Sequence, residues 1–186
     1  MAMPLATRRF TVDEYHRMAD AGILHEDDRV ELLDGQIVEM SPIYPPHAGC
    51  VNRLTRLLSA TLGDRATLSV QNPVVLGLHS EPQPDIAVLR PRADGYARRH
   101  PEAADALLLV EVAGSSLERD RDDKIPSYAE ARVPEVWLVN LPADAIEVYR
   151  GPVGGRYTDT NTVSRDATIR PLQLPGVELK ADEILG

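Results

Sequence analysis

The sequence predicts one α/β domain over residues 1–186, with a mixed central β-sheet flanked by helices and an N-terminal β-hairpin. Three observations predict this class. The length of 186 residues suits one domain. The apolar share of 43% is that of an ordinary globular core. Predicted strands outnumber predicted helices, and the helices fall between groups of strands.

The first element is predicted to be a short helix. Thr11 and Glu14 have the spacing of a capping box, in which each residue can bond the backbone N–H of the other. The helix is therefore expected to run from there to about Ala21 and to end at Gly22.

A β-hairpin is predicted next. The segments 30–33 and 36–40 are joined by Asp34-Gly35, the dipeptide that best supplies the positive φ angles of a two-residue type I′ turn. After a loop over 41–46, leucines recur at helical intervals up to Leu62, which predicts an amphipathic helix of about four turns.

The middle of the chain is rich in predicted strands. They are 67–71, 74–78, 85–89, 106–112 and 136–139, with a peripheral hairpin of 146–150 and 156–160. The run 106–112 is almost continuously apolar, which predicts a strand covered on both faces near the centre of the sheet. A helix is predicted from about Asp123 to Ala131, with Pro126 in its first turn.

The composition limits the classes of function. Lys and Arg number 20 and Asp and Glu 29, and the net charge of −9 argues against a protein that holds nucleic acid by bulk charge alone. The single cysteine, Cys50, excludes an internal disulfide framework and fits a reducing compartment. Residues 1–10 lack the apolar stretch of a signal peptide, and no apolar run suits a membrane span. A soluble cytoplasmic protein without a membrane partner is expected.

Two acids at the ends of apolar strands are the most informative feature. Asp85 opens one predicted strand and Glu111 lies near the end of another. If the strands are neighbours, the two carboxylates can converge on one hard cation, and such oxygen ligands suit Mg²⁺ or Mn²⁺. The alternative is that Asp85 ends a turn and Glu111 pairs with a structural arginine.

A lysine at a predicted helix start completes this set. Lys124 follows Glu111 by thirteen residues, and its ammonium could swing toward the strand end to stabilise developing negative charge. Taken alone, it could equally be a solvated lysine at a helix end.

These residues resemble a variant of the PD-(D/E)XK nuclease signature. The lysine has moved from its usual place two residues after the glutamate, where this chain has Ala113. More closely, the chain resembles the Uma-type family of putative restriction endonucleases over about residues 10–150. The matching stretches are 10–15, 30–42, His47, 83–89, 109–113, 115–117, Asp120-Arg121, Lys124, Pro126, 128–129 and 133–139.

The resemblance implies a restriction-endonuclease-like core, metal-dependent hydrolysis of phosphodiester bonds in nucleic acid, with DNA as the expected substrate, and a homodimer. It implies that Asp85 and Glu111 hold the metal with the Val112 carbonyl, and that Lys124 acts as the displaced lysine. Glu31 matches an acid of the family motif and is expected to be an extra ligand or a water-positioning group, or else a cross-strand partner. The alternative function is a non-catalytic module that binds nucleic acid or protein and keeps the nuclease fold.

Three further residues are candidate substrate contacts. His47 lies where the second helix begins, and helix N-termini bind phosphate, although capping or packing is an equal alternative. Arg90 and Arg92 belong to a locally positive loop between the two acid-bearing strands, which is expected to take a phosphate backbone or to be a solvated loop balanced by nearby acids.

Overall fold

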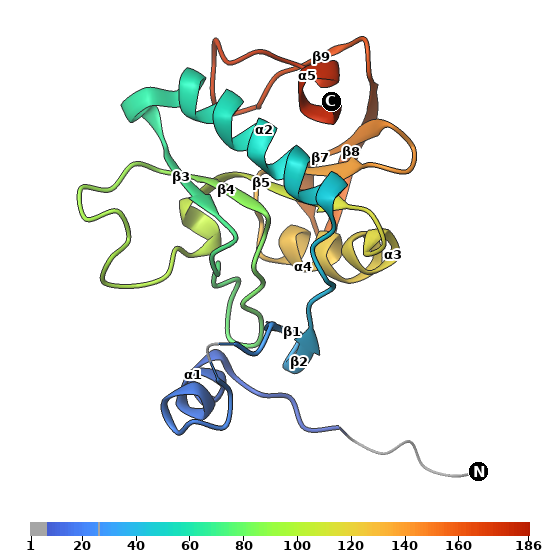
Figure 1. Ribbon diagram of the computed structural model, residues 1–186. Helices are drawn as coiled ribbons and strands as arrows, with labels where there is room; N and C mark the ends of the chain where they lie inside the picture. Colours follow the sequence, from blue (N-terminus) through green and yellow to red (C-terminus); the bar gives the residue numbers. More distant parts are fainter. Residues whose placement is uncertain (1–6, 26) are drawn as a thin grey trace.

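A six-stranded sheet forms the centre of the computed structural model, which describes residues 7–25 and 27–186 (Figure 1). The strand order is β3-β4-β5-β6-β7-β8, and all neighbours are antiparallel except β5 and β6. The bounds are β3 (Thr67–Val70), β4 (Ile86–Leu89), β5 (Ala106–Ala113), β6 (Glu135–Asn140), β7 (Ala145–Val153) and β8 (Arg156–Ser164). The predicted mixed sheet with flanking helices is confirmed. Residues 1–6 belong to the N-terminal segment that was expected to lack a signal peptide. They lie outside the described residues.

Helices cover both faces of this sheet. The long helix α2 (Pro45–Leu62) crosses one face, where Leu54 and Leu58 join a core that includes Val110 of β5 (Figure 1). The shorter helix α4 (Ile125–Glu130) packs on the other face, where Tyr128 joins a core with Leu109. Because side chains alternate along a strand, Glu111 shares the face of Leu109 and points toward α4.

The C-terminal segment completes the α2 side of the molecule. It contains β9 (Thr168–Ile169), β10 (Leu179–Lys180) and α5 (Ala181–Leu185). The guanidinium of Arg53 on α2 donates to the carbonyls of Ile184 and Leu185 at 2.9 and 2.6 Å. Cys50 is fully buried beside this contact and serves as a core residue.

The N-terminal elements follow the predicted local signals. Helix α1 (Val12–Asp20) has the capping box, with the Glu14 N–H donating to the Thr11 hydroxyl at 3.2 Å. The hairpin pairs β1 (Val30–Leu33) with β2 (Gln36–Glu39). Both turn residues have positive φ, 48° at Asp34 and 76° at Gly35, as a type I′ turn requires.

The predicted strand over 74–78 is wrong. This segment folds back on the residues that follow it, because Val74 N–H donates to Pro82 at 2.9 Å and Leu76 N–H donates to Ser80 at 2.9 Å. Only Val75 forms an isolated bridge, with Glu102. The apolar side chain of Val74 is buried, so it serves the core without belonging to a sheet.

The helix expected to begin near Asp123 begins earlier. A helical turn, α3 (Leu117–Arg119), leads through a π-helical turn, η3 (Asp120–Lys124), into α4. Short 3₁₀ turns occur at η1 (Gly63–Arg65) and η2 (Ala103–Asp105). Within the described part of the chain, no helix has both the length and the apolar character that a membrane span requires.

The turn of the hairpin is expected to be sensitive to a single methyl group. An alanine Cβ at Gly35 would lie 2.5 Å from the Cβ of Arg9 and 2.8 Å from its Cα. Gly22 has a similar φ of 69° but open space around it, so Gly22→Ala is the matched control for backbone strain. We expect Gly35→Ala to lower the free energy of unfolding by about 1–3 kcal/mol more than Gly22→Ala, measured by urea denaturation. Equal losses would contradict the close packing of this turn.

Candidate active site

A cavity of about 290 Å³ opens at the end of the sheet where β4 begins and β5 ends. Its lining comes from the hairpin, the start of α2, both strands, η3 and the loops between them. The titratable groups of the wall that could bind an ion or a substrate include Glu31, His47, Asp85, Glu111, Asp120 and Lys124. The structure therefore brings five sequence-predicted site residues to one cavity and adds Asp120.

The two strand-borne acids are neighbours across an antiparallel pair. Ile86 pairs with Val110, so Asp85 and Glu111 come next in the same register and face the same side of the sheet. Asp85 is fixed there because its Oδ2 accepts the Val112 N–H at 2.8 Å. Sequence reasoning asked whether the two strands are adjacent, and they are.

His47 lies against Asp85 rather than capping its own helix. Its Nε2 is 3.0 Å from Asp85 Oδ2, and Gln71 donates to Asp85 Oδ1 at 3.2 Å. The other ring nitrogen, Nδ1, is buried without a hydrogen-bond partner in the described part of the chain. A bond from Nε2–H to the carboxylate would leave Nδ1 as the unused hydrogen-bonding atom of a ring that lines the cavity.

Lys124 is buried, with only 5% of its surface exposed, so it is not a solvated lysine. Its Nζ lies 3.1 Å from Glu31 Oε2 and 3.3 Å from Glu111 Oε1. The Tyr128 hydroxyl donates to the same oxygen of Glu111 at 2.5 Å. Glu31 lies opposite Val38 in the hairpin, so its charged partner comes from η3 and not from across the strand.

The burial of these charges shifts their pKa values. Burial raises the pKa of Glu111 well above its ordinary value, and Lys124 offsets only part of this effect. Burial also raises the pKa of Asp120, against the ammonium of Lys124 and a hydrogen bond from Ser116. Burial alone would lower the pKa of Lys124, but the surrounding carboxylates raise it. The ammonium therefore keeps its proton, while Glu111 and Asp120 are easier to protonate than ordinary acids.

Asp120 is the acid that sequence reasoning did not assign. It is 4% exposed and accepts a hydrogen bond from the Ser116 hydroxyl at 2.6 Å. The signal was its place four residues before Lys124, because residues at that spacing share a helix face. Tyr128 lies in a stretch that resembles the family but was given no role, and Gln71 has no sequence signal for this site.

The structure does not bring Arg90 and Arg92 to the cavity. Both follow the far end of β4, about 17 Å or more of extended strand from Asp85. Arg92 forms an ion pair with Asp94 at 2.8 Å, and the Nε of Arg90 donates to a backbone carbonyl at 3.2 Å. The arginines that line the cavity are Arg29 and Arg119.

The donor set of the cavity fits a hard divalent cation. Four buried carboxylates, those of Glu31, Asp85, Glu111 and Asp120, line the same cavity as one buried ammonium, which contacts Glu31 and Glu111. A carboxylate oxygen has two lone pairs, and among the described residues Asp85 Oδ1 accepts only the Gln71 amide. Mg²⁺ characteristically takes one or two protein carboxylates and keeps several waters. Asp85 and Glu111 are the residues that could supply these carboxylates.

Fold and cavity together define a restriction-endonuclease-like α/β protein, in which adjacent strand ends carry two acids beside a lysine. The Uma2 family model, described as "Putative restriction endonuclease", matches residues 12–182, and the chain belongs to this family. The structure is also similar to the crystal structure of a putative nuclease belonging to DUF820 from Anabaena variabilis. The two chains have a TM-score of 0.75 and 18% identity, over 95% of this chain and 97% of the other. No curated protein matches the sequence.

Removal of the buried ammonium is expected to destabilise the fold strongly. Lys124→Met leaves Glu31 and Glu111 buried without their cation, and loss of one partner of a buried ion pair costs about 3–5 kcal/mol. The matched control is Arg121→Met, which removes a partly exposed pair in which Glu147 keeps its bonds from Asn140 and Tyr149, and it should cost about 1 kcal/mol. Urea denaturation at neutral pH measures both, and equal losses would contradict the assigned role of Lys124.

The loss in Lys124→Met is expected to depend on pH. The pKa values of Glu111 and Asp120 are raised in the folded chain, so protonation stabilises the folded state relative to the unfolded one. Stability from this source is present at low pH and is lost as the pH rises through the folded pKa values. Lys124 lowers both pKa values, so they rise further in Lys124→Met, and the difference from the wild-type chain should be larger at about pH 8 than at about pH 5. A constant difference would show that the acids do not carry the effect.

Proposed function

We propose that the chain is an endonuclease that hydrolyses phosphodiester bonds in DNA with the help of Mg²⁺ or Mn²⁺. The observation that carries this proposal is the shared cavity, in which Asp85 and Glu111 come from paired strands and Lys124 reaches the same carboxylate. Membership of the Uma2 family supports it independently.

Asp85 and Glu111 would hold the metal ion. Such an ion lowers the pKa of a bound water and polarises the phosphate. The surrounding residues keep both carboxylates in place. The Val112 N–H fixes Asp85 at 2.8 Å, and the Tyr128 hydroxyl fixes Glu111 at 2.5 Å. Preorganised carboxylates lose little conformational entropy when they bind an ion.

Lys124 would stabilise the negative charge that develops on the phosphate. Its raised pKa keeps it protonated, so it acts as a cation and not as a base. Glu31 holds the ammonium at 3.1 Å and accepts the backbone N–H of Gln83 at 3.0 Å. Glu31 is therefore a positioning residue, through which the hairpin sets the place of the lysine.

His47 and Arg119 would contact the phosphate backbone. His47 lines the cavity, and its Nδ1 has no partner among the described residues, so a small turn of the protonated ring would let it donate to a phosphate oxygen. Arg119 lies in the cavity wall, where a local cation can attract DNA although the whole chain has a net charge of −9. Cleavage of both strands of a duplex would require two copies of the site, and we propose a homodimer on this ground.

Cleavage of plasmid DNA tests the proposal. The wild-type chain is expected to cut in Mg²⁺ or Mn²⁺ and to stop when a chelator is added. Asp85→Asn and Glu111→Gln should each lower the rate about 100-fold or more, the loss typical of removing one preorganised electrostatic group. Asp123→Asn, which changes an exposed acid of η3, is the matched control and should cut at the wild-type rate.

The outcomes separate the candidate functions. Equal cleavage by the wild-type chain and both acid variants would mean a contaminating nuclease and would remove the support for an enzyme. Retention of DNA without cleavage would favour the non-catalytic module. Hydrolysis of a small phosphodiester without action on DNA would keep the chemistry and change the substrate.

The two groups of arginines are expected to differ in their effect on DNA binding. Arg119→Met should weaken DNA binding. It should also reduce the slope of log K against log salt concentration by the amount expected for about one phosphate contact. Arg92→Met removes a side chain that is paired with Asp94 away from the cavity and should leave binding unchanged. Filter binding over a range of salt concentrations measures both. The reverse order would place the DNA on the loop after β4.

A further inference from the structure

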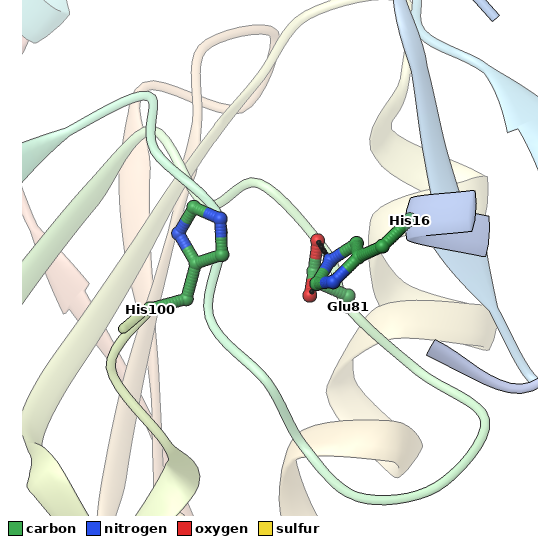
Figure 2. Close-up of side chains that lie close together, drawn as sticks. All are labelled: His16, Glu81 and His100. Carbon is green, nitrogen blue, oxygen red and sulfur yellow. Dashed lines mark hydrogen bonds and ion pairs between the residues drawn. The ribbon is translucent and has the colours of Figure 1, made fainter. Parts of the chain in front are cut away.

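A second group of potential metal ligands lies outside the cavity. Figure 2 shows His16, Glu81 and His100, which come from α1, from the loop before β4 and from the loop before β5. One ligand atom of each lies within 4.8 Å of the others. The His16 Nε2 is 2.8 Å from Glu81 Oε2 and 3.0 Å from Oε1. None of the three residues lines the cavity of the acid pair.

The burial of Glu81 calls for a cation at this place. Its side chain is 3% exposed, and within the described ranges its only charged or hydrogen-bonding side-chain partner is His16. The buried Glu31, Glu111 and Glu135 instead pair with a lysine or an arginine. A buried carboxylate is costly unless it is paired or coordinates a metal.

Backbone hydrogen bonds hold the three segments together. The Glu81 N–H donates to Leu32 of the hairpin at 2.8 Å, which places the carboxylate. The Val12 N–H at the start of α1 donates to Leu78 at 2.9 Å. The Val75 N–H donates to Pro101 at 2.8 Å, beside His100. Three segments distant in sequence therefore present their ligands without a change of fold.

The chemistry of the donors selects the class of metal. Two imidazole nitrogens and one carboxylate oxygen suit Zn²⁺ and similar transition metals, whereas Mg²⁺ prefers oxygen alone. The ring centroids of His16 and His100 are 5.9 Å apart, and the rings are tilted by 57°. His100 is exposed and the side chain of His16 is 42% exposed, so a water can complete the coordination.

We propose that His16, Glu81 and His100 bind one Zn²⁺-class ion that clamps α1 to the two loops. Helix α1 buries only Val12 among its own residues, so apolar packing holds it weakly. An ion ligated by His16 would link this helix to loops already tied to the hairpin and the sheet. Because it binds the folded chain and not the unfolded one, the ion would stabilise the protein.

Metal titration of the full chain tests this proposal. The experiment uses the full chain without a histidine tag, after treatment with a chelator that is then removed. Calorimetry with Zn²⁺ in the Asp85→Asn background, which removes the proposed ion site of the cavity, should show one site per chain with a dissociation constant in the micromolar range or tighter, and Zn²⁺ should raise the thermal midpoint. His100→Ala should weaken this binding at least about tenfold and abolish the thermal shift. Because His100 is exposed, its loss leaves the core intact.

Two control variants assign the signal to this site. His25→Ala changes an exposed histidine outside the cluster and should bind Zn²⁺ as the wild-type chain does. Asp85→Asn changes the acid pair of the cavity and should also keep the Zn²⁺ site, so the result does not depend on nuclease activity. The proposal is overturned if the wild-type chain takes up no Zn²⁺ in this range. It is equally overturned if His100→Ala binds as tightly as His25→Ala.

Discussion

The shared ammonium of Lys124 is the interaction on which the candidate active site depends. It lies 3.1 Å from Glu31 of the hairpin and 3.3 Å from Glu111 of the central strand, and it comes from the π-helical turn η3. Three elements distant in sequence therefore meet at one charge. Without it, two carboxylates would be buried unpaired, and the hairpin would lose its ionic link to the sheet.

The same arrangement explains why the cavity is suited to a cation. Burial is the main cause of the raised pKa values of Glu111 and Asp120, and the neighbouring carboxylates keep the proton on Lys124. Four buried acids exceed what one ammonium can neutralise. Protons relieve this excess at low pH, and a divalent ion bound by Asp85 and Glu111 would relieve it at neutral pH. Such an ion would also supply local positive charge for a polyanionic substrate, although the chain as a whole has a net charge of −9.

Local sequence signals predicted the elements whose conformation is fixed locally. Asp34-Gly35 gave the turn because few other residues adopt two positive φ values, and the apolar run 106–112 gave the central strand because both its faces are covered. The prediction of a strand over 74–78 failed because an apolar stretch does not indicate whether a neighbouring strand is there to pair with it. Arg90 follows Asp85 closely in sequence, yet an extended strand carries it to the opposite end of the sheet. Contacts such as His47 with Asp85 depend on tertiary packing, which no local pattern encodes.

The position of Lys124 beside Glu111 follows from the geometry of β5 and η3. Residues 111 and 113 share one face of the strand, so a lysine two residues after the acid would approach the cavity from the sheet. Here Ala113 is fully buried and carries no charge, so the cation beside Glu111 comes from another position. The π-helical turn brings Asp120 and Lys124 inward together, and the ammonium reaches the same carboxylate from the helix side. The proposed chemistry requires a cation beside Glu111, and a lysine at either of two backbone positions can supply that cation.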